Sequence, residues 1–385
     1  MTRVLVAGAG FSGAVLARSL AESGFDCLVV DERSHVAGNC HTSEDADTGI
    51  LIHRYGPHIF HTDDEDIWNF VRRFGEWLPY RHSVHATVKG RVFNLPINLL
   101  TINQFFHTAM TPEEAKAFVA KRCVTNANPA NFQEQALAMV GQELYEAFFC
   151  HYTAKQWGVE AEHLPASILK RLPMRFSYDS NYFHHRQQAM PRHGYTEVVE
   201  AMLAHPRIEL RLGVAAENLS EMFAHTFYTG GIDRYFGYSL GRLGYRSLRF
   251  EEIRVRGDAL GCPVMNFPDA ELAWTRMTEH RHLSPWRKPR SDVSVVWKEF
   301  PEAAGPNSPM FYPLRLARDE QLLESYVALA RNQTGLTFLG RLGCYAYIDM
   351  DAAVRRSLDT ATIAAQALRA GASPPVFVHD PLAKA

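Results

Sequence analysis

Residues 4–32, VLVAGAGFSGAVLARSLAESGFDCLVVDE, decide the fold of the first part of this 385-residue chain. The segment reads as a short buried strand (Arg3–Ala7), a helix with apolar residues at helical spacing (Ser12–Ser23) and a second strand (Cys27–Val30). Glycines stand between the first strand and the helix, and an acid follows the second strand. A strand, glycine turn, helix and strand in this order predict a dinucleotide-binding domain with a parallel sheet.

Each glycine of the turn has a distinct expected role. Gly8 allows the tight turn, Gly10 lets the backbone approach a pyrophosphate, and Gly13 lets helix and strand pack closely. The helix N-terminus offers unpaired N–H groups to the phosphates. Asp31, about twenty residues further on, is placed to accept hydrogen bonds from a ribose.

The turn alone does not separate NAD from FAD, but the sequence after it favours FAD. A simple NAD dehydrogenase continues strand, helix and strand in register. Here residues 37–64, AGNCHTSEDADTGILIHRYGPHIFHTDD, form a stretch rich in glycine, histidine and aspartate instead. We therefore expect a flavoprotein, because a bulkier cofactor needs contacts from several separated segments.

Composition excludes several other classes of partner. The chain is 46% hydrophobic and 21% charged, with a net charge of −2, which predicts neither nucleic acid nor a membrane surface as a partner. The longest stretch without acidic or basic residues, Val92–Pro112, is rich in polar residues and predicts no membrane span. The start of the chain lacks a secretory pattern, so we expect a cytoplasmic protein.

Cysteine and histidine spacing predicts no metal centre. The six cysteines are widely separated and form no CxxC pair, which indicates reduced thiols. Two histidine pairs stand out, His58 with His61 and His280 with His282. Neither pair has the additional ligands at helical spacing that a zinc site needs.

Hydrophobic periodicity indicates how the rest of the chain is organised. Residues 85–95 read as a hairpin that turns at Lys89 and Gly90, residues 131–149 as one long helix, and residues 164–180 as a mobile basic loop rather than a core element. We expect four stretches: 1–80, the first part of the FAD-binding domain; 81–185, a mainly helical lobe that holds the basic loop; 186–330, a sheet domain with returning segments of the FAD-binding domain; and 331–385, the C-terminal part of that domain.

Motifs spread over nearly the whole chain give a resemblance to a known family. They are, in order, GAGFSG (8–13), GN (38–39), YGPHIFHT (55–62), FNLPINL (93–99), YTAKQWG (152–158), PASILKRLP (165–173), NYF (181–183), GYRSL (244–248), NF (266–267), TR (275–276), YP (312–313) and GRLGCYAYIDMD (340–351). Together they resemble the flavin-dependent UDP-galactopyranose mutases of bacteria. A series of motifs in one order is far more specific than any one of them.

The resemblance implies an α/β fold: a Rossmann-like FAD-binding domain of glutathione-reductase type, an inserted helical lobe and a substrate-side antiparallel sheet. It also implies a homodimer and a nucleotide-sugar substrate. Family members interconvert UDP-galactopyranose and UDP-galactofuranose, which supplies galactofuranose for surface polysaccharides. N5 of reduced FAD attacks the anomeric carbon while UDP leaves and returns, so an external reductant for FAD is required.

The same resemblance implies the residues of the site. Arg171 and Arg276 match arginines that bind the diphosphate, and His58 and Asp349 match residues close to the flavin. By helical spacing alone Phe148 and Phe149 are core residues, yet they also match the uridine side. The expected substrate-binding residues are His82, Phe148, Phe149, Tyr152, Thr153, Trp157, Tyr182, Asn266, Tyr312 and Tyr347. The expected cofactor-binding residues are Gly8, Gly10, Phe11, Ser12, Gly13, Asp31, Glu32, Gly38, Asn39, His58, Ile59, Arg341, Ile348, Asp349, Met350, Asp351, Ala352 and Ala353.

Several positions depart from the family pattern: AG stands before Asn39 where GG is expected, and the departures that bear on the sugar are the five at His82, His151, Gly231, Trp274 and Ala346. They put the sugar in question, and a fucose or N-acetylhexosamine nucleotide is the alternative substrate. Two other readings share the nucleotide turn. One is an FAD oxidoreductase related to amine oxidases, and the other is a flavin-bound sensor without turnover.

Overall fold

Five parallel strands of the described chain form the sheet that carries the glycine-rich turn. The computed structural model describes residues 2–171 and 174–383, apart from the side chains at positions 167, 170 and 171. The strand order is β10 (Ile208–Leu212), β2 (Asp26–Asp31), β1 (Arg3–Ala7), β11 (Thr226–Tyr228) and β17 (Leu336–Phe338). The central strand β1 pairs in parallel with β2 and β11. Strands from three distant parts of the sequence therefore meet in one sheet.

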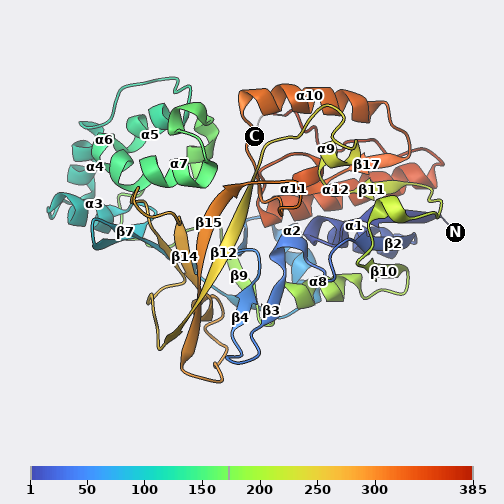
Figure 1. The fold of residues 1–385 in the computed structure, drawn as a ribbon, viewed down its shortest axis with the longest axis horizontal. Coiled ribbons are helices and arrows are strands. Elements are labelled where there is room, and N and C mark those ends of the chain that lie inside the picture. Colours follow the sequence, from blue (N-terminus) through green and yellow to red (C-terminus); the bar gives the residue numbers. More distant parts are fainter. Residues whose placement is uncertain (1, 172–173, 384–385) are drawn as a thin grey trace.

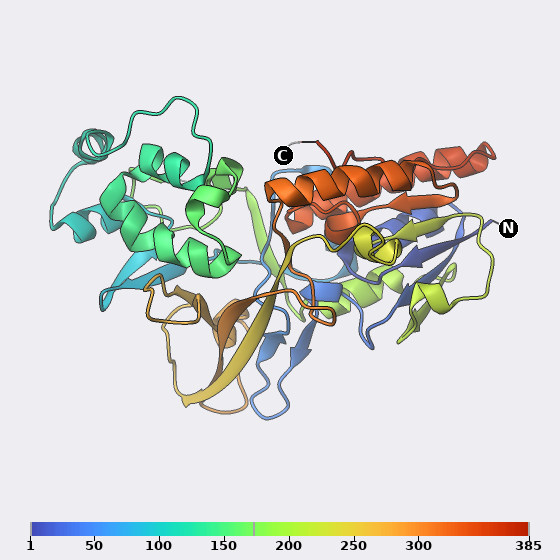
Figure 2. The same cartoon turned by 45° about the horizontal axis from the view of Figure 1, so that its top comes forward.

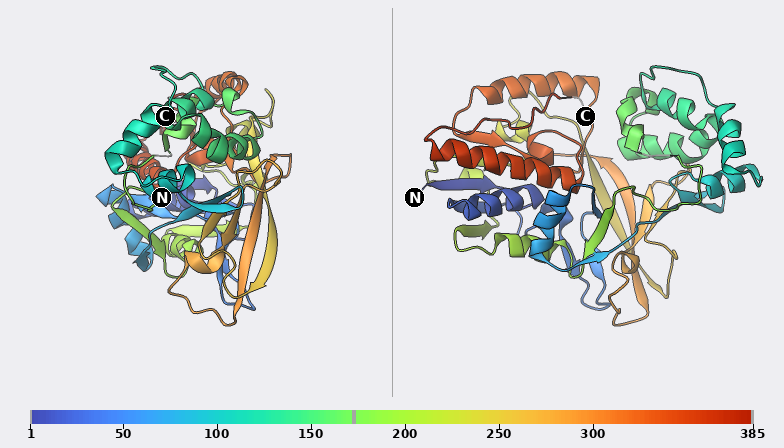
Figure 3. Two further views of the ribbon diagram at one scale, coloured as in Figure 1. Left: turned by 90° about the vertical axis from the view of Figure 1, so that its left-hand side faces the viewer. Right: turned by 180° about the vertical axis from the view of Figure 1, so that it is seen from behind.

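Helices cover both faces of this sheet, because successive side chains of a strand point to opposite faces. Val4 and Val6 pack toward α1 (Phe11–Glu22), α8 (Tyr195–Leu203) and α12 (Met350–Arg369). Leu5 and Ala7 pack on the opposite side, toward α10 (Ala317–Arg331). Figure 1 shows α10 on one side of the strands and α1 and α8 on the other, and Figure 3 shows the same layers from behind. The predicted α/β class with a Rossmann-like domain is confirmed.

A second sheet, of seven strands in the described residues, extends from this domain toward the helical lobe. Its order is β16 (Tyr312–Pro313), β12 (Tyr245–Arg256), β15 (Val293–Ala303), β14 (Arg276–Glu279), β13 (Val264–Asn266), β7 (Val84–Val88) and β8 (Arg91–Leu95). The hairpin predicted at 85–95 is the β7–β8 pair. All neighbours are antiparallel except β13 and β7, which run in parallel. Figure 2 shows these long strands between the cofactor domain and the lobe.

The helical lobe consists of α3 (Leu99–Phe106), α4 (Pro112–Ala120), α5 (Phe132–Val140), α6 (Gln142–Tyr145), a π-helical turn at Glu146–Cys150 and α7 (His151–Trp157). The single helix predicted over 131–149 is wrong, because the chain breaks at Gly141. This residue has φ +78°, and a Cβ there would lie 2.9 Å from the carbonyl oxygen of Arg122. The helix direction therefore changes where the 122 loop packs against it.

The segment predicted as a mobile basic loop, 164–180, is partly core. It contains the short 3₁₀ helix η5 (Ala166–Arg171), and Leu164 and Leu169 are buried among the lobe helices. Arg175 is also buried, and its guanidinium donates to the carbonyl oxygen of Asn181 and to the Asp179 carboxylate. The prediction of a loop outside the core is therefore wrong for Leu164, Leu169 and Arg175, because their side chains are buried.

The remaining elements connect the three parts. They are β3 (Thr42–Glu44), β4 (Leu51–His53), β5 (Phe60–Thr62), α2 (Glu65–Val71), β6 (Trp77–Pro79), β9 (Gln187–Pro191), α9 (Ile232–Tyr235), α11 (Gly340–Gly343) and the 3₁₀ turns at Gly38–Cys40, Arg72–Phe74, Ala161–His163, Ala216–Asn218 and His280–Leu283. None of the helices in the described part of the chain is both long and apolar enough to cross a membrane.

Candidate functional site: a dinucleotide cavity beside a half-buried arginine

The glycine-rich turn is fixed by close contacts that leave no room for side chains. Gly8 has φ +116°, and a Cβ there would lie 1.9 Å from Thr229 Oγ1 on the neighbouring segment after β11. A Cβ on Gly13 would lie 1.9 Å from the carbonyl oxygen of Gly8. The N–H of Ala9 donates to Asp31 Oδ2 at 2.8 Å, which ties the turn to the end of β2.

Two helix N-termini open into one cavity beside this turn. α1 begins after Gly10 and α12 after Asp349, and in these described segments neither cap residue makes a side-chain hydrogen bond to the helix. Free N–H groups and the helix dipoles make both ends suitable for phosphate oxygens. The predicted cofactor residues that line the cavity are Gly8, Gly10, Phe11, Ser12, Gly13, Asp31, Glu32, Gly38, Asn39, His58, Arg341, Ile348, Asp349, Met350 and Ala353.

Three predicted cofactor residues, Ile59, Asp351 and Ala352, do not belong to this lining. Ile59 packs against the core of the cofactor domain. Asp351 lies in the first turn of α12, where its carboxylate accepts from the N–H of Ala352. The residues after β11 and the 214–217 loop line the cavity as well, and sequence reasoning missed them. The one sequence feature that could have indicated these residues is the glycine turn after β11, at positions 230 and 231.

His58 lines the same cavity as a neutral imidazole. Its Nδ1 lies 3.0 Å from the carbonyl oxygen of Gly56, and a carbonyl only accepts, so Nδ1 carries the hydrogen and Nε2 is an acceptor. Burial, together with the positive charges of Arg341 and Arg276, lowers the pKa of His58 to about 4. At neutral pH this side chain therefore presents a lone pair without a charge.

Arg276 is held by a buried carboxylate that sequence reasoning missed. Its Nε donates to Glu299 Oε2 at 2.9 Å, and the Glu299 side chain is 2% exposed. Burial disfavours the charged guanidinium, but the attraction of Glu299 outweighs it and raises the pKa of Arg276 well above its ordinary value. The pair fixes one edge of the guanidinium fork, which suits planar, charge-assisted recognition of a second anion.

Aromatic side chains from four separate segments surround Arg276. Tyr312 and Tyr347 meet edge to face with ring centroids 5.6 Å apart, and Trp157 lies 5.9 Å from Tyr347. Burial raises the pKa of Tyr182 and of Tyr312 to about 12, and it also raises that of Tyr152, so all three hydroxyls remain protonated. The charge of Arg276 acts on each of these tyrosines, which places them near it.

The sheet and the lobe bring further predicted substrate residues to this group. Asn266 stands directly opposite Arg276 in the β13–β14 pair. Thr153 is buried on α7. His82 is buried with its ring 5.8 Å from that of Tyr182, and burial and the charge of Arg276 lower its pKa to about 3.

Two predicted residues have a clear packing role, and a third is outside the description. Phe148 meets the rings of Phe93 and Phe105 in the lobe core, and Phe149 is buried in the same core. Arg171 is the last residue of η5, and its side chain lies outside the described residues.

The other departures from the family pattern have different surroundings. His151 is exposed at the start of α7. Ala346 is buried next to Cys344 and Ile348. Gly231 precedes α9. Trp274 lies under the ammonium of Lys298, 4.3 Å from Nζ to the ring centroid. Of the five departures, His82 is the one that shares surroundings with Arg276.

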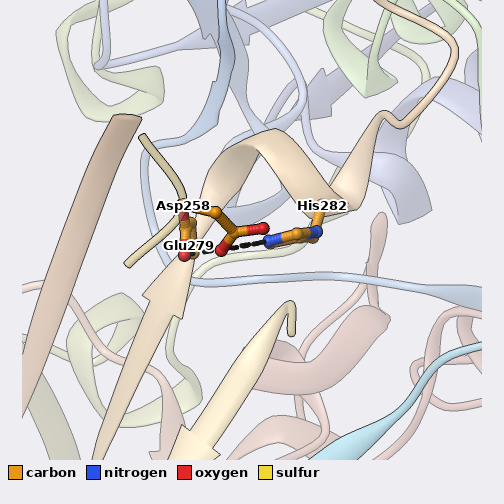
Figure 4. A group of neighbouring side chains, drawn as sticks. All are labelled: Asp258, Glu279 and His282. Carbon is orange, nitrogen blue, oxygen red and sulfur yellow. Dashed lines mark hydrogen bonds and ion pairs between the residues drawn. The ribbon is translucent and has the colours of Figure 1, made fainter. Parts of the chain in front are cut away.

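One group in the described chain has side chains of the kinds that bind metals: Asp258, Glu279 and His282 (Figure 4). The Glu279 carboxylate is fully buried and accepts from the N–H groups of residues 259 and 260 and from Ser294 Oγ. His282 Nε2 lies 3.0 Å from Asp258 Oδ1. These hydrogen bonds hold the loop that follows β12 in place, which accounts for the group without a metal ion. His280, which the sequence pairs with His282, does not join this group. Its ring is buried against those of Trp297 and His53.

Comparison with known proteins gives one consistent family. A model described as an NAD(P)-binding Rossmann-like domain matches residues 6–74, and one described as UDP-galactopyranose mutase matches residues 147–347. Among solved structures, a reduced UDP-galactopyranose mutase shares the fold with a TM-score of 0.74 at 15% identity, covering 96% of both chains. A putrescine oxidase shares it with a TM-score of 0.55 at 11% identity, covering 94% of this chain and 98% of the other.

Curated relatives are similar over nearly their full length. A Klebsiella pneumoniae protein described as "Probable UDP-galactopyranose mutase" is 48% identical over 93% of both chains. A dTDP-fucopyranose mutase of Escherichia coli is 43% identical over 94% of this chain and 98% of its own. A UDP-galactopyranose mutase of Mycoplasma pneumoniae is 33% identical over 92% of this chain and 94% of its own. The chain therefore belongs to the UDP-galactopyranose mutase family, whose members are isomerases.

Proposed function

We propose that this isomerase interconverts UDP-galactopyranose and UDP-galactofuranose. The observation that carries the proposal is the Arg276–Glu299 pair, in which a buried carboxylate fixes a half-buried cation beside a dinucleotide cavity and among protonated tyrosines. A sugar nucleotide needs such a cation, because its diphosphate must leave the anomeric carbon and return to it. An amine oxidase substrate has no diphosphate, so the pair favours a mutase over the oxidoreductase reading.

FAD is the cofactor that we assign to the cavity. The residues fit it in two ways: at Gly10 the backbone faces the cavity with no side chain in between, and two helix N-termini open toward the lining. Asp31, the segment at 38–39, Arg341 and the segment at 348–350 belong to this lining. When bound and reduced, the flavin supplies the nucleophile for the anomeric carbon.

The chain's own residues bind the substrate and control charge. Arg276 binds a diphosphate oxygen with the edge of its guanidinium that Glu299 leaves free, and Arg171 supplies the second cation. The hydroxyls of Tyr182 and Tyr312 donate hydrogen bonds to the same oxygens. These donors stabilise the negative charge that grows on the diphosphate as its bond to the sugar lengthens.

The base and the sugar have separate proposed contacts. Trp157 and Tyr152 on α7 offer apolar faces to the uracil, and the Asn266 amide donates to its oxygen. His82 contacts the sugar, and neutral His58 accepts a hydrogen bond through Nε2 on the flavin side. Asp349 lines the cavity and its charge acts on Tyr182, so we assign it to the boundary between the cofactor and the substrate. Phe148 acts only by packing in this scheme.

A second sugar is favoured by one observation. The Escherichia coli relative that is 43% identical is named a dTDP-fucopyranose mutase, and His82 departs from the family pattern near the proposed sugar position. dTDP-fucopyranose is therefore the alternative substrate.

The wider setting belongs to the same proposal. We expect a cytoplasmic homodimer that takes electrons from an external reductant and supplies furanose sugars for surface polysaccharides. The near-neutral charge of the chain is compatible with free diffusion to a small anionic substrate.

The test is conversion of UDP-galactofuranose by the purified flavoprotein, with and without dithionite, and with dTDP-fucofuranose in parallel. The proposal predicts UDP-galactopyranose in the reduced sample alone, and loss of conversion with retained FAD in Arg276→Gln. Faster conversion of dTDP-fucofuranose would transfer the assignment to that sugar. Reduced, FAD-bound protein that converts neither sugar would overturn the proposal.

A further inference from the structure

Lys155 on α7 lies inside a ring of backbone oxygens. Its ammonium nitrogen is 2.6, 2.9, 3.0 and 3.1 Å from the carbonyl oxygens of residues 267, 269, 272 and 274, in that order. An ammonium has three N–H groups, so four oxygens satisfy it completely with one shared bond. The lysine therefore acts as an internal cation around which residues 267–274 fold.

This loop joins the two strands that carry proposed substrate contacts. β13 ends with Asn266 and β14 begins with Arg276. The two residues face each other in register, and the N–H of Phe267 closes the loop on the carbonyl oxygen of Thr275 at 2.8 Å. A change in the shape of the loop thus moves the guanidinium and the amide together.

Arg246 makes the reciprocal connection from the sheet back to the helix. Its Nε donates to the carbonyl oxygen of Gln156 at 3.0 Å, and its Nη2 donates to that of Lys155 at 3.2 Å. Arg246 is 7% exposed and stands on β12. Two basic side chains, half-buried Lys155 and buried Arg246, therefore join α7 to the sheet, each bound to backbone oxygens of the other part.

The same short helix carries the proposed base contacts. Tyr152 precedes Lys155 by one helical turn, and Trp157 follows it by two residues. Figure 1 shows α7 on the side of the lobe that faces β14 and β15. Any shift between α7 and the loop changes the separation between these rings and Arg276, which a rigid nucleotide diphosphate must span.

We propose that Lys155 is a positioning residue that sets the distance between the diphosphate cation Arg276 and the nucleobase wall on α7. The inference rests on the proposed function for the identity of the ligand, and it adds a residue that touches neither substrate nor cofactor. Because the ammonium already holds the loop in one conformation, substrate binding loses no free energy to ordering it.

The test compares Lys155→Met, which keeps the length of the side chain but donates nothing, with Lys155→Arg. Lys116→Met is the matched control, because Lys116 is an exposed lysine on α4 of the same lobe. For Lys155→Met we expect KM for the nucleotide sugar to rise at least tenfold, with kcat within threefold of wild type and unchanged FAD content. UDP affinity, measured by tryptophan fluorescence, falls by a similar factor, and Lys155→Arg restores at least a third of it.

A folded, FAD-bound Lys155→Met with KM and UDP affinity within twofold of the Lys116→Met values would overturn the inference. If Lys155→Met does not fold, hydrogen exchange of the wild-type holoenzyme decides: slow exchange of the Phe267 and Thr275 amides supports the clamp, and exchange at the rate of an open loop refutes it. UDP binding tests the clamp without turnover. If the wild-type protein converts neither sugar but still binds UDP more tightly than Lys155→Met does, the proposed function is refuted while the role of Lys155 stands.

Discussion

Substituting alanine at Gly10 and at Gly13 separates two roles that one motif combines. At Gly13 the new Cβ lies 1.9 Å from the Gly8 carbonyl oxygen and 3.3 Å from Val6 Cγ1. Real contacts begin near 3.0 Å, so α1 and β1 must separate by about 1.1 Å. At Gly10 the nearest protein atom is the Gly38 Cα, 3.8 Å away, and φ is −78°, which suits alanine. The protein therefore has room for a methyl group at Gly10 and none at Gly13.

The consequences differ in kind. Overpacking costs about 1–3 kcal/mol, so Gly13→Ala loses that amount of folding free energy even without FAD. Gly10→Ala keeps the FAD-free fold close to wild type, but its methyl group occupies the side from which a pyrophosphate approaches. The same 1–3 kcal/mol then appears as FAD affinity weakened about 5- to 150-fold.

The assay pairs denaturant unfolding of FAD-free protein with FAD titration followed by flavin fluorescence. The expected pattern is lower stability for Gly13→Ala and weaker FAD binding at normal stability for Gly10→Ala. Wild-type FAD affinity in Gly10→Ala would refute the placement of the phosphates at this turn. Equal loss of stability in both variants would refute the packing argument.

Three further predictions concern the site, the histidines and the lobe. Arg276→Lys should lower kcat/KM about 10- to 100-fold with FAD retained. The reason is that a single ammonium replaces the two hydrogen-bonding edges of the guanidinium, and each charged hydrogen bond is worth about 1.5–3 kcal/mol. Steady-state kinetics would measure this loss, and a wild-type kcat/KM would contradict it. Burial lowers the pKa of His280 to about 3, so between pH 6.5 and 3 the unfolded state binds a proton that the folded state does not. The free energy of unfolding therefore decreases as the pH is lowered, by about 1.4 kcal/mol per pH unit. Denaturant unfolding at pH 7, 6 and 5 should therefore show a shallower fall in His280→Phe than in the exposed control His163→Gln, and equal slopes would count against this account. Gly141→Ala should destabilise the lobe by about 1–3 kcal/mol, because the new Cβ meets the Arg122 carbonyl oxygen. The free energy of unfolding in denaturant should fall by that amount while FAD affinity stays at the wild-type value. Unchanged stability would contradict the reason given for the helix break.

Local signals in the sequence predicted the secondary structure around the glycine-rich turn well. The strand, turn and helix around Gly8 and Gly13 depend on neighbours within about thirty residues, and the β7–β8 hairpin depends on Lys89 and Gly90. Patterns of this length determine their own structure. The position of Arg276 near the nucleotide site came from the family resemblance, not from periodicity.

Contacts between distant segments explain what sequence reasoning missed. The helix break at Gly141 arises from the carbonyl group of residue 122, which no local pattern reveals. Glu299 lies in a valine-rich strand and gave no signal before the structure placed it under Arg276. Lys155 is an ordinary helix lysine in sequence, and its partners are backbone oxygens more than a hundred residues away.

The order of the parallel sheet also constrains how the protein is made. β1 and β2 leave the ribosome first, yet β11 and β17 on one flank come from residues near 226 and 336. The helix α12, whose first turn also lines the cavity, begins at Met350. During synthesis the apolar edge of β1 therefore waits for most of the chain, a non-local pairing of the slow-folding and aggregation-prone kind. A nascent chain that ends before residue 336 has the glycine turn but lacks the cavity-lining residues from Gly340 onward, so the complete cavity can form only late in synthesis.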